Sequence, residues 1–237
     1  MRVHPVPLGL SQAYLLESGA GVVLVDAGSP HQERVILRHL QALRQAQDKA
    51  LGADNLQLIF ITHAHLDHYG SAAAIRRLTG APVAIHRADA EAMARGETRL
   101  GSARGRGKLM GVLLPLVELC LRPEPVQPDL LLEDGDDGYR FGDYGLEARV
   151  IHTPGHTPGS SCLIVEERLG FVGDLLSNTG RPHLQSLYAE DWSLLKQSYA
   201  RLQGIELETV YPGHGRRPVS GKALQRLIAS HQHVISK

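Results

Sequence analysis

Short runs of branched and aromatic apolar residues recur along the chain, and most of them end at a glycine, a proline or a polar residue. Runs of this length and composition are typical of buried β-strands. A glycine-containing turn joins the first two runs, which predicts a β-hairpin. The pattern predicts strands over residues 12–17, 21–26, 56–61, 82–86, 130–132, 139–141, 146–151, 161–165, 170–173 and 209–211.

Longer segments between these runs carry apolar residues at helical spacing. They predict helices over residues 30–50, 70–78, 88–94, 191–202 and 220–235. Asp191 is the expected N-cap of the fourth helix, because its carboxylate can accept hydrogen bonds from the first turn. Strands precede helices in each half of the chain, and this order predicts two sheets with helices packed outside them.

Residues 95–128 depart from this alternation. The segment begins with basic residues, becomes strongly apolar over residues 109–117, and closes with a proline-rich stretch. Its apolar part is shorter than the roughly 20 residues needed to cross a bilayer, and Pro115 would kink a helix there. We therefore expect no membrane span here. We expect a helical insertion or lid, which could cover a substrate, complete the core or form a homodimer contact.

A cluster of metal-ligand residues follows the apolar run over residues 56–61. His63, His65, Asp67 and His68 lie within six residues of sequence. Imidazole and carboxylate groups are ligands of Zn²⁺, and also of Fe and Mn. In an extended segment His63 and His65 point to the same side, and a following turn can bring Asp67 and His68 to a neighbouring point. The spacing indicates two adjacent metal positions; an accidentally histidine-rich loop is the alternative.

Three later strand ends carry residues of the same kind. The turn HTPGHTPGS at residues 152–160 holds His156 between prolines and glycines, which make a rigid loop. Asp174 follows the apolar run at 170–173, and His214 lies between two glycines that allow close approach of the backbone. We expect His152 to support the turn rather than to bind metal.

The motifs HAHLDH, TPGHTPGS, GD and PGHG, in this order, resemble those of the metallo-β-lactamase superfamily. The resemblance implies one domain over residues 1–237 with an α/β fold, a four-layer αββα sandwich, and residues 95–128 as an insertion within it. It also implies a dinuclear site with two divalent ions per chain, Zn²⁺ or else Fe or Mn²⁺. By position in the motifs, the first ion has His63, His65 and His156 as ligands, the second has Asp67, His68 and His214, and Asp174 bridges them.

The function that this resemblance implies is hydrolysis. Two metals sharing a hydroxide supply a nucleophile at neutral pH, and Asp67 is the candidate catalytic residue that orients the hydroxide and accepts a proton. We predict cleavage of a small-molecule ester, thioester or lactone. The candidate substrate contacts lie after the bridging carboxylate, where ordinary polar loop residues are the alternative reading: Asn178, Arg181, His183 and Tyr188.

Two other functions remain open from the sequence. A mononuclear iron oxygenase of the persulfide dioxygenase type would use only His63, His65 and His156 with Asp174, and the complete second ligand set argues against it. A phosphodiesterase or nuclease is the other alternative. The chain has 25 basic and 25 acidic residues and a formal net charge of zero, which argues against a broad basic surface for nucleic acid.

Composition adds little beyond these expectations. The 237 residues are 43% hydrophobic and 21% charged, near the average for globular proteins, so the chain can bury a large core. Cys120 and Cys162 both lie in apolar stretches and are expected to be buried, inert thiols. The N-terminal residues lack an apolar signal region, and we expect a cytoplasmic protein.

Overall fold

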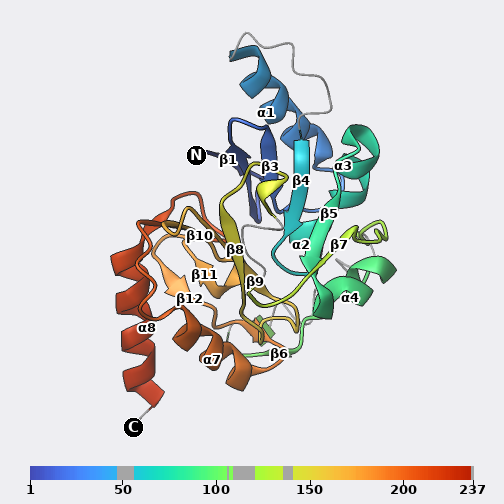
Figure 1. The fold of residues 1–237 in the computed structure, drawn as a ribbon. Coiled ribbons are helices and arrows are strands. Elements are labelled where there is room, and N and C mark those ends of the chain that lie inside the picture. The colour runs from blue at the N-terminus through green and yellow to red at the C-terminus, as the bar shows by residue number, and fades with distance from the viewer. Residues whose placement is uncertain (47–55, 106, 109–120, 136–140, 236–237) are drawn as a thin grey trace.

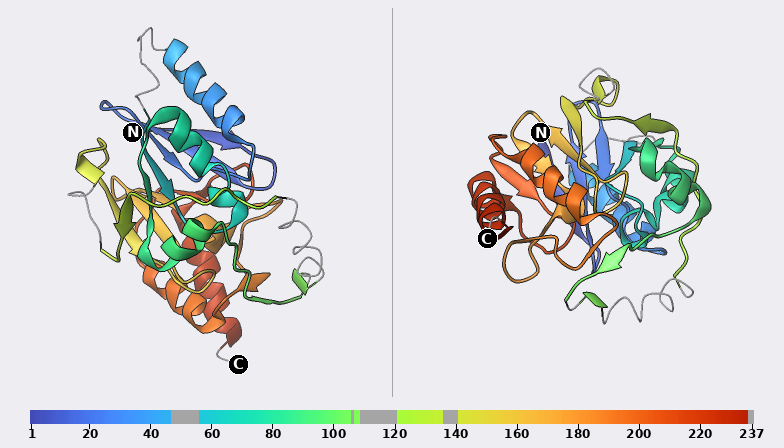
Figure 2. Two further views of the ribbon diagram at one scale, coloured as in Figure 1. Left: turned by 90° about the vertical axis from the view of Figure 1, so that its right-hand side faces the viewer. Right: turned by 90° about the horizontal axis from the view of Figure 1, so that it is seen from below.

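A computed structural model describes residues 1–46, 56–105, 107–108, 121–135 and 141–235. Two β-sheets form the centre of this part of the molecule (Figures 1 and 2). The first sheet has the strand order β1-β2-β3-β4-β5-β7, and its members are β1 (Arg2–Pro7), β2 (Gln12–Glu17), β3 (Val22–Val25), β4 (Leu56–Ile61), β5 (Val83–His86) and β7 (Leu130–Leu132).

The second sheet is formed by the later part of the chain. Its strand order is β15-β14-β10-β9-β8, with β8 (Ala148–His152), β9 (Ser161–Val165), β10 (Leu169–Phe171), β14 (Thr209–Tyr211) and β15 (Val219–Ser220). Two small two-stranded ribbons lie beside the sheets, and they pair β11 (Leu176–Ser177) with β12 (His183–Leu184), and β6 (Ser102–Ala103) with β13 (Tyr188–Ala189).

Helices cover the outer face of each sheet (Figure 2). The helices from the first half of the chain are α1 (Glu33–Ala46), α2 (Leu66–Tyr69), α3 (Ala72–Thr79) and α4 (Ala90–Arg95), with the 3₁₀ turn η2 (Arg87–Asp89) before α4. The second half contributes the 3₁₀ turn η3 (Gly173–Leu175), α7 (Trp192–Leu202) and α8 (Gly221–Ile235).

Alternation along the strands divides the buried side chains into three layers. On β4, Ile59 and Ile61 pack with the helices of the first half, whereas Leu58 and Phe60 face the other sheet. Side chains on a strand point to opposite faces in turn, so each central strand supplies two hydrophobic layers. A third layer joins the second sheet to α7 and α8. Three apolar layers between four layers of secondary structure constitute an αββα sandwich, and the predicted fold is confirmed.

Most predicted elements agree with the structure within a few residues. Asp191 caps α7 as expected, because its carboxylate accepts from the backbone N–H groups of Ser193 and Leu194. One predicted strand is wrong: Phe141, assigned to a strand over residues 139–141, lies in a helical turn, and residues 136–140 are outside the described part. The end of the first predicted helix, residues 47–50, is also outside it.

The segment over residues 95–128 is described only in part. It starts at the end of α4 and supplies β6, which pairs with β13 from the second half of the chain. Residue 106 and residues 109–120, which include Cys120 and most of the predicted apolar helix or lid, lie outside the described residues. Within the described part, no helix is both long and apolar enough to cross a membrane. Cys162 is buried, as predicted.

Candidate metal centre

The predicted ligands come together where strand ends of the two sheets meet. β4 leads into His63 and His65, and the same segment continues into α2, which carries Asp67 and His68. The turn after β8 supplies His156, η3 after β10 supplies Asp174, and the loop after β14 supplies His214. A backbone hydrogen bond from Ser161 to the carbonyl of Thr62 joins the sheets beside this point. Residues far apart in sequence thus form one cluster.

The first group in this cluster consists of three buried histidines and a carboxylate. The Nδ1 atom of His65 lies 3.1 Å from Nε2 of His63 and 3.0 Å from Nε2 of His156. The Asp174 Oδ2 atom lies 3.3 Å from His156 Nε2. These separations approach the edge of about 3.3–3.4 Å expected for a tetrahedron with metal–nitrogen bonds of about 2.0–2.1 Å. The group could hold one metal ion.

The second group lies directly beside the first. Asp67, His68 and His214 present ligand atoms within 4.8 Å of one another. The other oxygen of Asp174, Oδ1, lies 3.2 Å from His68 Nε2 and 3.1 Å from His214 Nε2. Oδ2 also lies 3.1 Å from His214 Nε2, so His214 contacts both oxygens. Asp174 therefore lies between the two groups, where a bridging carboxylate would lie. The assignment of the individual ligands stays a prediction.

Hydrogen bonds on the far side of each ring direct its other nitrogen into the cluster. A ligating histidine normally donates its other N–H to a carbonyl or carboxylate, which fixes the tautomer. Each of the five histidines has such an acceptor in the structure: Thr62 Oγ1 for His63 (3.0 Å), the Arg99 carbonyl for His65 (2.6 Å), Asp26 Oδ2 for His68 (2.8 Å), the Tyr188 carbonyl for His156 (3.2 Å) and the Leu10 carbonyl for His214 (2.7 Å).

This arrangement has a direct consequence for the centre of the cluster. Since the outward nitrogens hold the protons, the inward atoms of His63, His65 and His156 face one another with lone pairs, which repel unless a cation lies between them. Within the described part of the chain, His68 Nε2 and Asp174 Oδ1 are buried and form no hydrogen bond, although they lie 3.2 Å apart. Buried polar atoms without partners are costly. The donor set therefore fits divalent ions of the borderline type, such as Zn²⁺.

Electrostatics differ between the two groups. Burial lowers the pKa of His63 well below its usual range, and the neighbouring imidazole of His68 adds to the effect. Burial, with the His156 imidazole, also lowers the pKa of His65 to about 3. Both rings are consequently neutral at physiological pH, which is the form that binds a metal ion.

In the second group, the neighbouring carboxylates determine the direction of the histidine pKa shifts. Burial lowers the pKa of His68, but the charges of Asp67, Asp174 and Asp26 outweigh it and raise the pKa well above the usual range. Burial also opposes protonation of His214, but Asp174 and Asp67 raise its pKa to about 9. Burial raises the pKa of Asp174, yet the charges of His214 and His68 hold it well below normal.

As the pH is lowered, the second group is therefore expected to lose its metal ion before the first group does. Without metal, His68 and His214 carry protons that an incoming ion must displace, so affinity there falls as pH decreases below about 9, by up to about tenfold per proton for each pH unit. His63 and His65 have no proton to lose above the ordinary histidine pKa. Zinc titrations at about pH 8 and about pH 6, with bound metal quantified, should show loss of one ion per chain. Equal weakening of both ions would contradict this prediction.

Asp26 is a site residue to which no role was assigned from the sequence. It follows β3, is buried, and adopts a left-handed backbone with φ of 59°. Its carboxylate accepts from the backbone N–H and hydroxyl of Thr62 as well as from His68. A single side chain thereby orients a histidine of each group, directly for His68 and through Thr62 for His63. The available signal was a carboxylate directly after a buried strand.

Close backbone approach explains one of the glycines around His214. A β-carbon at Gly213 would overlap Asp174 Oδ1 and would lie 2.9 Å from the ring of His68. Only glycine allows the loop to pass this close to the carboxylate. The sequence-based expectation for this loop is confirmed for Gly213.

The predicted substrate contacts lie around the cluster without joining it. Asn178 donates to the Arg217 carbonyl, and its own N–H bonds to the carbonyl of His214. The ring of His183 bonds to the carbonyl of Arg181. Tyr188 contacts His156 through its carbonyl, while its hydroxyl is buried and unpaired in the described part of the chain. Their contact with substrate stays a prediction.

His152, the other histidine of the turn that carries His156, makes a different set of contacts. The His152 ring bonds to the carbonyl of Pro158 at 2.8 Å and stacks on His86 at 3.8 Å between centroids. It therefore supports the turn that carries His156, as expected, and it belongs to neither candidate metal group among the described residues.

The family profile of the metallo-beta-lactamase superfamily matches residues 6–214. The chain belongs to this superfamily. A metallo-beta-lactamase of Cronobacter sakazakii with a HARLDQ motif superposes with a TM-score of 0.71 at 24% identity, over 99% of this chain and 90% of that one. At this identity the superposition supports the fold alone, and it agrees with the αββα sandwich.

The curated relatives include proteins that are named as thioesterases. The acyl-coenzyme A thioesterase MBLAC2 of Homo sapiens is 30% identical over 178 residues, which are 69% of this chain and 57% of the relative. The atrochrysone carboxyl ACP thioesterase of Aspergillus fumigatus is 26% identical over 206 residues, 86% of this chain and 50% of that protein. The chain spans about half to two thirds of the length of the first curated relatives it matches.

Proposed function

We propose that this chain is a metal-dependent hydrolase that holds two divalent ions and cleaves a small-molecule thioester or ester. The observation that carries the proposal is the set of inward ligand atoms in two adjacent groups, each histidine fixed from behind by an acceptor. Zn²⁺ suits this donor set best, and Fe and Mn²⁺ are compatible with it. Bound ions would lower the pKa of a shared water and polarise the carbonyl of the substrate.

The side chains of the centre have separate roles in this proposal. Asp174, with 8% of its side chain exposed, is enclosed between the two groups and serves as the bridge. Asp67 is more open, with 20% of its side chain exposed, and its Oδ2 lies 3.6 Å from His214 Nε2. Because it reaches both the second group and the solvent side, we assign Asp67 as the proton acceptor during attack on the acyl carbon.

A thioester on an anionic carrier is the substrate class that the surroundings favour. Arg216 and Arg217 follow His214 after one glycine, are exposed, and have no ion pair among the residues the structure describes. Asn178 fixes this loop by its bond to the Arg217 carbonyl. Most arginines elsewhere in the described chain pair with carboxylates, as Arg77 does with Glu124. Exposed guanidinium groups two and three positions after His214 suit phosphate recognition. Two relatives are named as an acyl-coenzyme A thioesterase and a carboxyl ACP thioesterase.

The direct test is a substrate screen with quantified metal. The purified chain loaded with Zn²⁺, Mn²⁺ or Fe²⁺ would be assayed on acyl-CoA thioesters, lactones and phosphodiesters. We expect about two ions per chain and hydrolysis of thioester or ester substrates. One iron per chain with oxygen consumption and no hydrolysis would favour the oxygenase alternative. Phosphodiester cleavage with strongly salt-dependent RNA binding would favour a nuclease.

The arginines give a separate prediction about the carrier. Substituting Arg216 and Arg217 together by alanine is expected to raise the KM for an acyl-CoA by about tenfold or more, because a hydrogen bond to a charged group contributes about 1.5–3 kcal/mol. The KM for the same acyl group on N-acetylcysteamine, which lacks phosphates, should not change. Arg77→Ala, which removes a paired surface arginine, serves as the control. Equal loss on both substrates would contradict phosphate recognition.

A further inference from the structure

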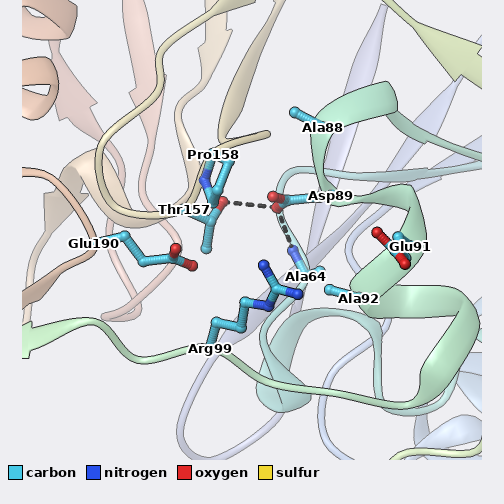
Figure 3. Close-up of a pocket in the computed structure, with 9 residues that line it drawn as sticks. All are labelled: Ala64, Ala88, Asp89, Glu91, Ala92, Arg99, Thr157, Pro158 and Glu190. Carbon is cyan, nitrogen blue, oxygen red and sulfur yellow. Dashed lines mark hydrogen bonds between the residues drawn. The ribbon is translucent and has the colours of Figure 1, made fainter.

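A buried carboxylate outside the candidate ligand set joins the two loops that carry the first group. Asp89 ends η2 directly after β5, the strand next to β4, and is only 2% exposed. Within the described part of the chain, no basic side chain pairs with it. Figure 3 shows its carboxylate between Ala64, on the segment from β4, and Thr157, on the turn after β8.

Three hydrogen bonds converge on this carboxylate. Oδ2 accepts from the Ala64 N–H at 2.8 Å and from the Thr157 hydroxyl at 2.7 Å, and Oδ1 accepts from the Gly159 N–H at 2.6 Å. Ala64 lies between His63 and His65 in the sequence, and Thr157 follows His156. One side chain therefore fixes the backbone beside all three histidines of the first group.

We propose that Asp89 is a positioning residue that sets the separation of the His63–His65 loop from the His156 loop, and so sets the metal affinity of the first group alone. This inference rests on the proposed metal-dependent function. It concerns a residue that touches neither substrate nor ligand atoms and acts through the backbone of the ligand loops.

A carboxylate suits this position better than an amide does. Three donors face Asp89, and both of its oxygens accept. Asparagine would turn its NH₂ group toward at least one of these donors, leaving a buried N–H or hydroxyl unpaired. The backbone of Gly159 also lies very close to Asp89, since a β-carbon at Gly159 would lie 2.6 Å from the Asp89 carboxyl carbon.

Packing alone does not hold the loops together here. A cavity of about 30 Å³ adjoins Asp89, Ala64 and Thr157, with Arg99 and Glu190 on its other wall (Figure 3). This space is large enough for a water molecule, so the ligand loops could shift into it if the carboxylate bonds were lost. Hydrogen bonding by Asp89 therefore adds to the close contact at Gly159 in fixing their positions.

The second group does not depend on this carboxylate. His68 is held by Asp26 and His214 by the Leu10 carbonyl, and neither contact involves η2. The Ser11 hydroxyl bonds to the Asp67 carbonyl. Loss of the Asp89 bonds should consequently affect one group and spare the other.

The test compares Asp89→Asn in two backgrounds that each disable one group. His214→Ala disables the second group, and His156→Ala disables the first. Zinc affinity of the full chain would be measured by competition with a chromophoric chelator. We expect Asp89→Asn to weaken zinc binding by about 10–100-fold in the His214→Ala background, the usual effect of losing support behind a ligand, and to leave it unchanged in the His156→Ala background.

Two further variants distinguish a specific effect on the first group from a general loss of stability. Thr157→Val removes one of the three bonds while leaving both backbone donors paired, and should weaken the first group in the same direction by a smaller factor. Asp129→Asn is the matched control, because that carboxylate also accepts from a strand N–H, Val83 at 2.9 Å, but touches no ligand loop. It should lower thermal stability without changing either affinity.

The outcomes separate this inference from the proposed function. Unchanged zinc affinity for both Asp89→Asn and Thr157→Val in the His214→Ala background would overturn the positioning role, as would equal weakening of both groups. If Asp89→Asn does not fold, Thr157→Val decides. If the unmodified chain binds two ions and Asp89→Asn weakens only the first group, the inference stands even when no thioester or ester is hydrolysed.

Discussion

Replacing Asp174 with alanine is expected to remove at least one of the two bound ions and to lower turnover by about 10³-fold. The Asp174 oxygens lie 3.1–3.3 Å from the ligand nitrogens of His156, His68 and His214. Alanine would leave both groups one ligand short and would leave their charges uncompensated. Loss of several kcal/mol of metal-based stabilisation of the transition state corresponds to a factor of about this size. Metal content per chain and kcat on an acyl thioester measure the effect.

A surface carboxylate provides the comparison for this variant. Glu124 is 54% exposed, and among the described residues it pairs only with Arg77, at 2.7 Å. Glu124→Ala should keep both ions and full turnover, since exposed ion pairs contribute little. An Asp174→Ala protein that retained two ions and full turnover would show that Asp174 is not the bridge.

Complete removal of metal is expected to abolish hydrolysis and to lower the melting temperature. The inward nitrogens of His63, His65 and His156 would then face one another without a cation. An ion present at 1,000 times its dissociation constant stabilises the folded chain by about 4 kcal/mol, so the loss should be measurable by thermal unfolding. Activity and melting temperature should both return when Zn²⁺ or Mn²⁺ is added to chelated protein.

The Asp174→Ala variant is also the control for this second prediction. Because its metal affinity is already reduced, chelation should change its melting temperature much less than that of the unmodified chain. Persistent hydrolysis by protein whose metal content has been measured as negligible would refute metal dependence and, with it, the proposed chemistry.

The sequence predicted the central strands and the motif loops because both have local signals. The run over β4 is apolar on both faces and ends at Thr62, so the strand and the following histidines could be placed together. The αββα architecture followed from the resemblance carried by these motifs, and the structure agrees. The identity of the ligands, their pairing into two groups and the single-domain organisation remain predictions that metal analysis and mutagenesis must test.

Features without a local signal were missed. β1 contains Pro5 and Pro7, which disfavour a strand, yet it forms the edge of the first sheet. β6 and β13 are two-residue strands that lie far apart in the sequence, yet Ser102 and Ala103 pair with Ala189 and Tyr188. The roles of Asp26 and Asp89 depend on which loops lie next to them in space. Long-range contacts of this kind cannot be derived from spacing along the sequence.

The distribution of the candidate ligands between the two sheets has a consequence for how long the folded state lasts. His63, His65, Asp67 and His68 follow the first sheet, whereas the other three ligands follow the second. Each ion would thus act as a non-covalent cross-link across the layer between the sheets, and separating the sheets would require breaking its bonds. Unfolding of the loaded chain should therefore be slow and metal-controlled, and metal scarcity would shorten the lifetime of the protein as well as reduce its activity.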